Sequence, residues 1–186
     1  LEMYVPMASL LGIQGIKSEL QDLCFTYLYP EEFQLYRDRI ASSDQRLQPL
    51  QDKVTEGMRC AFTEHHVRAD IFPRRKTLYS IFHKMQSQGK SIDDVYDLIT
   101  LRIVVDGVDD AYLALGVIHT LFKPKPGKFK DYIAVPKVNG YRSLHTTVFG
   151  PDGVLVEFQI RTREMDLEAD YGITTFYFLG SKQTAD

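Results

Sequence analysis

The sequence contains no tryptophan, only two cysteines, and no long apolar run. No stretch approaches the roughly 18 consecutive apolar residues that a membrane-spanning helix needs, and no basic segment marks a secretory signal at the N-terminus. Cys24 and Cys60 have no zinc-type neighbours, which favours free thiols in a reducing compartment over a disulfide. We therefore expect a cytoplasmic protein with no membrane partner.

Two common sequence signatures for phosphate binding are also missing. No GxGxxG is present, so nothing supports a Rossmann dinucleotide site. The segment Gln88–Ser91 ends like a P-loop, but Lys84 stands where the first glycine belongs, and a helix rather than a strand comes before it. Any nucleotide site must therefore be built from side chains.

What the sequence does have is enough apolar material for a core and an uneven distribution of charge. Apolar residues make up 44% of the 186 residues, which suits one domain with an accessory piece. The formal net charge is −3, but residues 1–70 carry −4, residues 71–145 carry +5 and residues 146–186 carry −4. This segregation favours a localised anion site, with a chance distribution as the alternative.

Residues 1–70 have the periodicity of helices, and no catalytic cluster is evident among them. Apolar side chains recur at helical spacing over residues 16–28. A second pattern over residues 33–62 predicts either one long amphipathic helix or two helices broken near Ser42–Ser43 or Pro49. We treat this part as a helical linker or accessory region.

Residues 71–186 alternate between helix and strand patterns and form the second predicted domain. The expected elements are a helix from Pro73 to Gly89, a strand over Asp97–Asp106, a helix over Asp109–Phe122, strands over Asp131–Val135, Ser143–Phe149 and Val154–Arg161, and a helix over Glu164–Leu179. The last two strands form a hairpin through a tight turn. The predicted class is α+β, a mixed β-sheet flanked by helices with an N-terminal helical extension.

The strand Val154–Arg161 carries the strongest signal for chemistry. Alternation puts Glu157, Gln159 and Arg161 on one face, opposite Val156, Phe158 and Ile160. A solvated face is the alternative, but a carboxylate on a rigid sheet suits a metal ion or a reacting hydroxyl. Asp97 begins another strand, and unless it only caps a helix, the two carboxylates could hold one Mg²⁺.

Basic side chains surround these carboxylates in the sequence. On the predicted helix from Pro73, Lys76, Ser80 and Lys84 share one face. Arg74 and Arg75 stand at its N-terminal turn, where cations are unfavourable unless an anion also binds. A second basic set follows farther along the chain and could also contact an anion, and its members are Lys123, Lys125, Lys128, Lys130, Lys137 and Arg142. The alternative interpretation of this set is a basic, mobile surface loop.

An aromatic ring and an imidazole follow the second basic set. Tyr141, next to the flexible pair Asn139–Gly140, could stack on a base, with a plain surface tyrosine as the alternative. His145 is predicted to face the same side of its strand as Ser143 and could contact phosphate or ribose, although a structural histidine is the commoner case.

Four segments carry a more specific pattern. They are Arg74-x-Lys76-x-x-Tyr79-Ser80-Ile81-x-x-Lys84-Met85, Val95 to Arg102 (VYDLITLR), Asp131 to Thr146 (DYIAVPKVNGYRSLHT) and Glu157 to Thr162 (EFQIRT). In this order they resemble the synthetase domain of the RelA/SpoT family, over residues 73–172. Residues 1–30 also resemble the helical stretch that joins the hydrolase and synthetase domains of long members. We therefore expect a fragment of a long, bifunctional-type member.

The resemblance implies a nucleotidyltransferase-like fold and transfer of pyrophosphate from ATP to the 3′-hydroxyl of GDP or GTP, giving (p)ppGpp and AMP in the stringent response. It implies that Asp97 and Glu157 hold Mg²⁺, or Mn²⁺ in its place, and that Glu157 takes the proton of the hydroxyl. The ATP residues it implies are Arg74, Lys76, Ser80, Lys84 and Lys130. The guanosine nucleotide residues it implies are Tyr141, Lys137, Asn139, His145 and Gln159.

Several departures from the family pattern qualify this expectation. Thr77 replaces a frequent histidine, Lys128 replaces the arginine of an Arg-x-Lys-Asp motif, and residues 174–177 differ from the usual Ala-Ala-His-Trp. The hydrolase His-Asp motif is absent. We expect ribosomes or other regulators to act only through parent domains that this chain lacks, and we expect no direct nucleic-acid binding. The alternatives are a catalytically silent nucleotide sensor and, less favoured, an RNA-binding domain.

Overall fold

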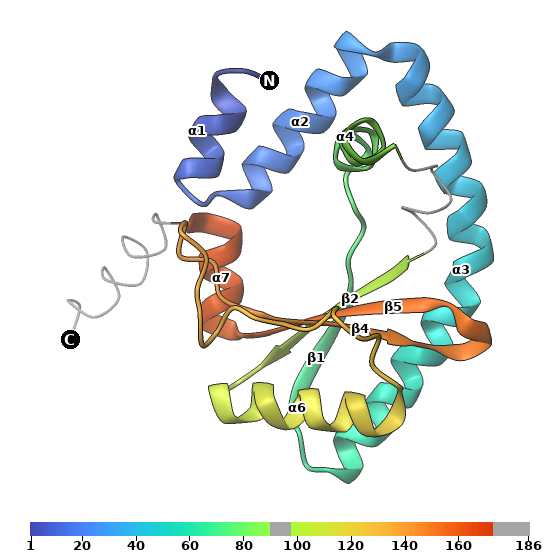
Figure 1. The fold of residues 1–186 in the computed structure, drawn as a ribbon, viewed down its shortest axis with the longest axis vertical. Helices are drawn as coiled ribbons and strands as arrows, with labels where there is room; N and C mark the ends of the chain where they lie inside the picture. The colour runs from blue at the N-terminus through green and yellow to red at the C-terminus, as the bar shows by residue number, and fades with distance from the viewer. Residues whose placement is uncertain (90–97, 173–186) are drawn as a thin grey trace, which may run out of the picture.

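The computed structural model describes residues 1–89 and 98–172. Within them, five strands form one mixed sheet in the order β1-β2-β5-β4-β3 (Figure 1). The strands are β1 (Ala69–Pro73), β2 (Leu98–Val105), β3 (Lys130–Asp131), β4 (Leu144–Phe149) and β5 (Leu155–Thr162). The central strands β2 and β5 run parallel, and the other pairs are antiparallel. The predicted α+β class with a mixed sheet is confirmed.

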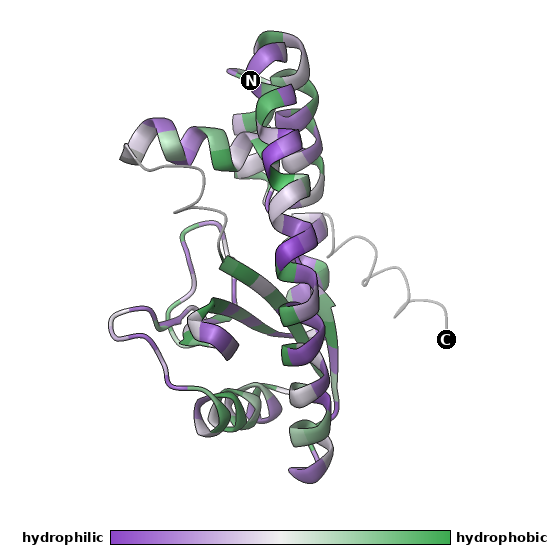
Figure 2. Cartoon of the chain, turned by 90° about the vertical axis from the view of Figure 1, so that its right-hand side faces the viewer, coloured by the Kyte–Doolittle hydropathy of each residue, from purple (hydrophilic) through white to green (hydrophobic). Residues whose placement is uncertain are grey.

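One face of the sheet is the hydrophobic core. It presents alternate residues of β2 and β5, such as Leu101 and Phe158, which are fully buried. Helix α6 (Val108–Leu121) and the second half of α3 (Pro30–Glu64) pack against this face. Figure 2 shows the central strands mainly in the green of hydrophobic residues, interrupted by paler or purple segments. The alternation predicted for β5 is therefore confirmed, and its polar residues are left for the opposite face.

The N-terminal region is helical as predicted, with α1 (Tyr4–Leu10) and α2 (Gln14–Leu28) preceding α3. Helix α3 is one unbroken helix that contains Pro49, which resolves the choice left open by the sequence. Its residues Val54, Met58 and Phe62 belong to the same core cluster as the sheet. The division into domains at residue 70 stays a prediction, since this packing joins the two parts.

An aromatic cluster joins α2 and α3 to α4 (Leu78–Gln88) at the end of the molecule opposite α6 (Figure 1). Phe25 is fully buried at its centre. Its ring centroid lies 4.8 Å from that of Phe82 on α4 and 5.9 Å from that of Phe33 on α3. Helix α4 is therefore fixed against the N-terminal helices. No helix in the described part of the chain is both long and apolar enough to cross a membrane.

The predicted helix start at Pro73 is wrong. Pro73 ends the edge strand β1, where its missing N–H costs no ladder hydrogen bond. Residues 74–77 are not helical, and α4 begins at Leu78 because Thr77 caps it, its Oγ1 accepting from the backbone N of Ser80 at 3.3 Å. The predicted end at Gly89 is confirmed by its left-handed conformation at φ 60°.

The predicted strand over Asp131–Val135 is also wrong beyond its first residue. The side chain of Asp131 accepts hydrogen bonds from the backbone N of Ile133 at 3.0 Å and of Ala134 at 2.8 Å, and this turns the chain away from β4. The last helix, α7, spans Arg163–Tyr171. Gly172 ends this helix, and residues 173–179 of its predicted length, like Asp97, lie outside the described residues.

Gly172, just after α7, lies against the loop between α1 and α2. A Cβ built on Gly172 would come within 2.0 Å of the carbonyl oxygen of Leu11, and Gly172 has φ 61°. We expect Gly172→Ala to lower the free energy of unfolding by about 1–3 kcal/mol, measured by urea denaturation, and to expose α1 and α2 to hydrogen exchange. The matched control is Gly57→Ala in exposed open space on α3, which should instead stabilise by about 0.5–1 kcal/mol. Equal effects would contradict the close contact.

Candidate active site

The polar face of the sheet gathers side chains from its three central strands. In the pairing register, Thr100 and Arg102 of β2 lie beside Glu157 and Gln159 of β5, respectively. On the other side of β5, His145 of β4 lies beside Gln159. Paired residues project to the same face of a sheet. The side chains that alternation assigned to the polar face of β5 thus form the centre of a wider polar surface.

A chain of hydrogen bonds crosses this face. Gln159 Nε2 donates to Glu157 Oε1 at 2.7 Å, and Gln159 Oε1 accepts from Arg74 and, at 3.4 Å, from Arg161. Glu157 Oε1 also lies 4.0 Å from His145 Nδ1. Gln159 therefore fixes the Glu157 carboxylate relative to two guanidinium groups.

Tyr141 connects this chain to β4. Its hydroxyl is 2.8 Å from His145 Nε2 and accepts from Arg161 at 2.8 Å. The Arg161 guanidinium carbon lies 5.0 Å from the centroid of the Tyr141 ring, and Lys137 Nζ lies 4.9 Å from it. Tyr141 and His145, both predicted to bind the guanosine nucleotide, are therefore in contact with each other, and two cations contact the tyrosine ring.

The arginines of the polar face are held by acidic residues of α7 that the sequence analysis missed. Asp166 Oδ1 lies 3.1 Å from Arg102 and 3.2 Å from Arg161, and Asp170 lies 3.6 Å from Arg102. The available signal was the spacing of Asp166 and Asp170 by four residues, which places both on one face of a helix. These pairs orient the guanidinium groups and offset part of their charge.

Two adjoining cavities open on the polar face. The first, about 440 Å³, contains Glu157, Gln159 and most of the predicted ATP residues, and we call it the Lys76 cavity. The second, about 280 Å³, contains the other predicted guanosine nucleotide residues, and we call it the Tyr141 cavity. Arg74, Gln14 and Asp170 line both. The predicted ATP residues that line the Lys76 cavity are Arg74, Lys76, Ser80 and Lys84. The predicted guanosine nucleotide residues that line the Tyr141 cavity are Lys137, Asn139, Tyr141 and His145.

Lys130 is the exception among the predicted ATP residues. It lines neither cavity, and its register partner is His145 at the β3–β4 edge of the sheet. The short strand β3 places it on the side of the Tyr141 cavity. Thr77, the departure from the family pattern, lines the Lys76 cavity and caps α4 there.

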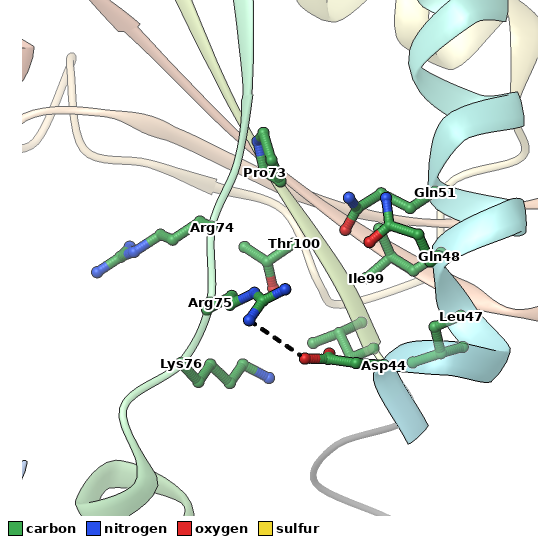
Figure 3. A pocket seen from close by; sticks show the side chains of 11 residues that line it. Asp44, Leu47, Gln48, Gln51, Pro73, Arg74, Arg75, Lys76, Ile99 and Thr100 are labelled. Carbon is green, nitrogen blue, oxygen red and sulfur yellow. Dashed lines mark ion pairs between the residues drawn. The ribbon is translucent and has the colours of Figure 1, made fainter. Parts of the chain in front are cut away.

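The two neighbouring arginines that follow β1 serve different contacts. Figure 3 shows Arg74 and Arg75 leaving the chain on opposite sides. Arg74 reaches Gln159 on the sheet, whereas Arg75 lies 3.5 Å from Asp44 of α3 across a small third cavity of about 120 Å³. An extended chain alternates its side chains, which explains why the pair separates where a helix would have kept both near one end.

The electrostatics of the Lys76 cavity favour an anion. Desolvation lowers the pKa of Lys76, and Lys84 and Arg74 lower it further, while Glu157 raises it. Desolvation, followed by the charge of Arg161, likewise lowers the pKa of Arg74. Cations crowded together in this way destabilise one another until an anion binds among them. The N-terminus of α4 opens on the same cavity and adds its dipole.

His145 is neutral in this site at neutral pH. Desolvation, together with Arg161, Lys137 and Arg74, lowers its pKa from 6.5 to about 4, although Glu157 raises it. As the pH falls below about 6.5, His145 binds a proton in the unfolded chain, whereas in the folded protein it binds one only near pH 4. The free energy of unfolding should therefore fall as the pH is lowered across this window. We expect His145→Gln to reduce that fall, measured by urea unfolding of the nucleotide-free protein.

The control for this titration is the exposed His65, where His65→Gln should leave the pH dependence as it is in the unchanged protein. An identical fall in stability with and without His145 would contradict its low pKa. In the folded protein a neutral His145 serves as a hydrogen-bond partner rather than as a charge.

The described residues offer a partial set of ligands for a divalent cation. Glu157 is the carboxylate that faces the Lys76 cavity at the sheet, and Thr100 Oγ1, beside it on β2, is buried and has no hydrogen-bond partner among the described residues. No group of three or more potential ligands occurs in the described part of the chain. Mg²⁺ commonly takes one or two carboxylates and completes its shell with phosphates and water, so this set fits it.

Comparison with known proteins places the chain in a family. Residues 73–177 match the family model described as a region found in RelA / SpoT proteins. A guanosine-3′,5′-bis(diphosphate) 3′-pyrophosphohydrolase of Aquifex aeolicus is 45% identical over 95% of this chain, and a GTP pyrophosphokinase of Streptomyces coelicolor is 44% identical over 95%. The chain spans only 26% and 21% of the lengths of these two relatives.

Solved structures agree with the sequence relatives. The small alarmone synthetase 1 of Bacillus subtilis bound to its product pppGpp superimposes with a TM-score of 0.57 at 26% identity, covering 82% of this chain and 83% of that chain. The small alarmone synthetase 2 of the same organism gives 0.57 at 27% identity, covering 78% and 82%. The match of both the sequence segments and the fold that carries the two cavities shows that this chain belongs to the RelA/SpoT family.

Proposed function

We propose that this chain transfers the β,γ-pyrophosphate of ATP to the ribose 3′-hydroxyl of GDP or GTP, forming AMP and (p)ppGpp for the stringent response. The observation that carries the proposal is the meeting of two cation-lined cavities at Arg74, which reaches the Gln159–Glu157 pair in the Lys76 cavity. A transfer between two nucleotides needs both substrates beside one reacting centre. The names of the relatives, GTP pyrophosphokinase and alarmone synthetase, support the same reaction.

ATP occupies the Lys76 cavity in this proposal. Lys76 and Lys84 neutralise its phosphates, and Ser80 together with the N-terminus of α4 donates hydrogen bonds to them. Arg74 presents a planar guanidinium to the adenine ring. Lys130 does not line this cavity, so we assign it no ATP contact.

The guanosine nucleotide occupies the Tyr141 cavity. Tyr141 stacks on guanine, and Lys137, Asn139 and neutral His145 contact the nucleotide by hydrogen bonds. Gln159 orients the Glu157 carboxylate, which accepts the proton of the 3′-hydroxyl as that oxygen attacks the β-phosphorus of ATP and AMP leaves.

We propose that Glu157 holds Mg²⁺ together with phosphate oxygens, with Asp97, outside the described residues, as a second ligand. The metal ion would neutralise charge on the phosphates when bound. Thr100 would offer its unpartnered hydroxyl on the same face. The remaining contribution is made by the chain itself, which brings the substrates together, places cations around the transferred group and orients one carboxylate.

Labelled ATP incubated with GDP, with GTP and with neither tests the proposal, with products separated by thin-layer chromatography. We expect Mg²⁺-dependent AMP and labelled (p)ppGpp in the first two reactions alone. Nucleotide binding without AMP would instead identify a silent nucleotide sensor.

A further inference from the structure

Part of the wall of the Tyr141 cavity comes from the N-terminal helices. Ser9 of α1 and Gln14 and Lys17 of α2 line it together with the residues assigned above to the guanosine nucleotide. These residues lie in the region where the sequence analysis found no catalytic cluster. Their own spacing gives no signal, because only the docking of α1 and α2 brings them to the sheet.

The position of α2 is fixed by contacts along its length. At its N-terminal end, the α1–α2 loop lies so close to Gly172 that a Cβ on Gly172 would come within 2.0 Å of the carbonyl oxygen of Leu11. In its middle, Asp22 Oδ1 accepts from the backbone N of Tyr79 at 3.0 Å. Farther along, Phe25 packs on Phe82 of α4. Lys17 lies between the first two contacts, so it is held at the cavity.

Lys17 adds an uncompensated positive charge to this cavity. Its Nζ donates to Ser9 Oγ at 3.2 Å, and no carboxylate in the described part of the chain pairs with it. Arg102 and Arg161, in contrast, are paired with Asp166 of α7. A half-buried ammonium whose described partner is a neutral hydroxyl can still donate to an anion.

We propose that Lys17 binds the 5′-phosphates of the guanosine nucleotide, so that the acceptor substrate is held jointly by the synthetase site and by helix α2. The inference rests on the proposed function and identifies a further binding residue for it. The base is taken by Tyr141 and the 3′-hydroxyl faces Glu157, which leaves the 5′ end to the remaining cations of the cavity. A consequence is that α2 must be docked for tight binding of GDP or GTP.

The test is a series of dissociation constants for guanosine, GMP, GDP and GTP, measured calorimetrically with the full chain in the absence of ATP. We expect Lys17→Met to raise the dissociation constants of GDP and GTP by about tenfold, which is the contribution of one charge-assisted hydrogen bond. The dissociation constant of guanosine should not change. Lys17→Arg should retain most of the affinity. Binding of a non-hydrolysable ATP analogue should not change, because Lys17 does not line the Lys76 cavity.

Lys53→Met, at an exposed position of α3, is the matched control and should leave all four constants unaltered. Equal weakening of guanosine and GDP by Lys17→Met would show that Lys17 only supports the fold, and this would overturn the inference. So would an unchanged constant for GDP. If the unaltered chain makes AMP but Lys17→Met binds GDP normally, only this inference fails. If the unaltered chain neither binds GDP nor makes AMP, the proposed function fails with it.

Discussion

Glu157→Gln should reduce kcat for AMP formation from ATP and GDP by about 10²–10⁴-fold, the contribution of a positioned general base. The substitution preserves the shape of the side chain and its oxygen, which can still accept from Gln159 Nε2. The protein should therefore keep its stability and bind both nucleotides within a few-fold of the unaltered affinity. The measurement is the initial rate of AMP release at saturating ATP and GDP.

The same substitution at Glu56, exposed on α3, is the matched control and should leave kcat unaltered. Activity of Glu157→Gln within tenfold of the unaltered enzyme would remove Glu157 from the reacting centre. A loss of nucleotide affinity with an unaltered kcat would also contradict the assignment, because it would make the carboxylate a binding group rather than a base.

Arg161→Met should lower the free energy of unfolding by about 3 kcal/mol, the lower part of the range for breaking a buried ion pair. Arg161 is 3% exposed and bridges Asp166 and the Tyr141 hydroxyl. The loss is not larger because Asp166 keeps its contact with Arg102 at 3.1 Å. Urea denaturation measures the effect.

Arg161→Met should also weaken the binding of GDP, because Tyr141 loses the guanidinium that contacts both its ring and its hydroxyl. Arg161→Lys should recover part of the stability but less of the GDP affinity, since an ammonium does not match the planar contact. Arg59→Met on the exposed face of α3 is the control, expected within about 0.5 kcal/mol of the unaltered protein. An equally small effect at Arg161 would contradict its buried pairing.

Local periodicity was sufficient for much of the fold. The alternation in β5 placed Glu157 and Gln159 opposite Phe158 without any knowledge of neighbouring strands, because the period of a strand is fixed by backbone geometry. The expected helix over Asp109–Phe122 matches α6 (Val108–Leu121) within one residue at each end. Pro49 illustrates the limit, since tertiary packing of α3 against the sheet overrides the preference of proline for helix ends.

The errors arose where one side chain redirects the backbone. Pro73 has the sequence signature of a helix start, but it pairs with β2 as the last residue of the extended strand β1. The helix begins only after the cap at Thr77. Asp131 is predicted to start a longer strand, but its carboxylate accepts hydrogen bonds from two backbone N–H groups. Such competition between local hydrogen bonds and a sheet depends on the neighbouring strand, which periodicity does not describe.

Residue types at fixed spacing are enough to indicate the family, the class of fold and the polar face that carries Glu157. Three further features depend on how the folded chain packs: Asp166 and Asp170 orient the arginines, Lys130 lies outside the Lys76 cavity, and α2 brings Lys17 to the Tyr141 cavity. Those contacts join residues far apart in the chain, and their distances are set by how helices pack on the sheet.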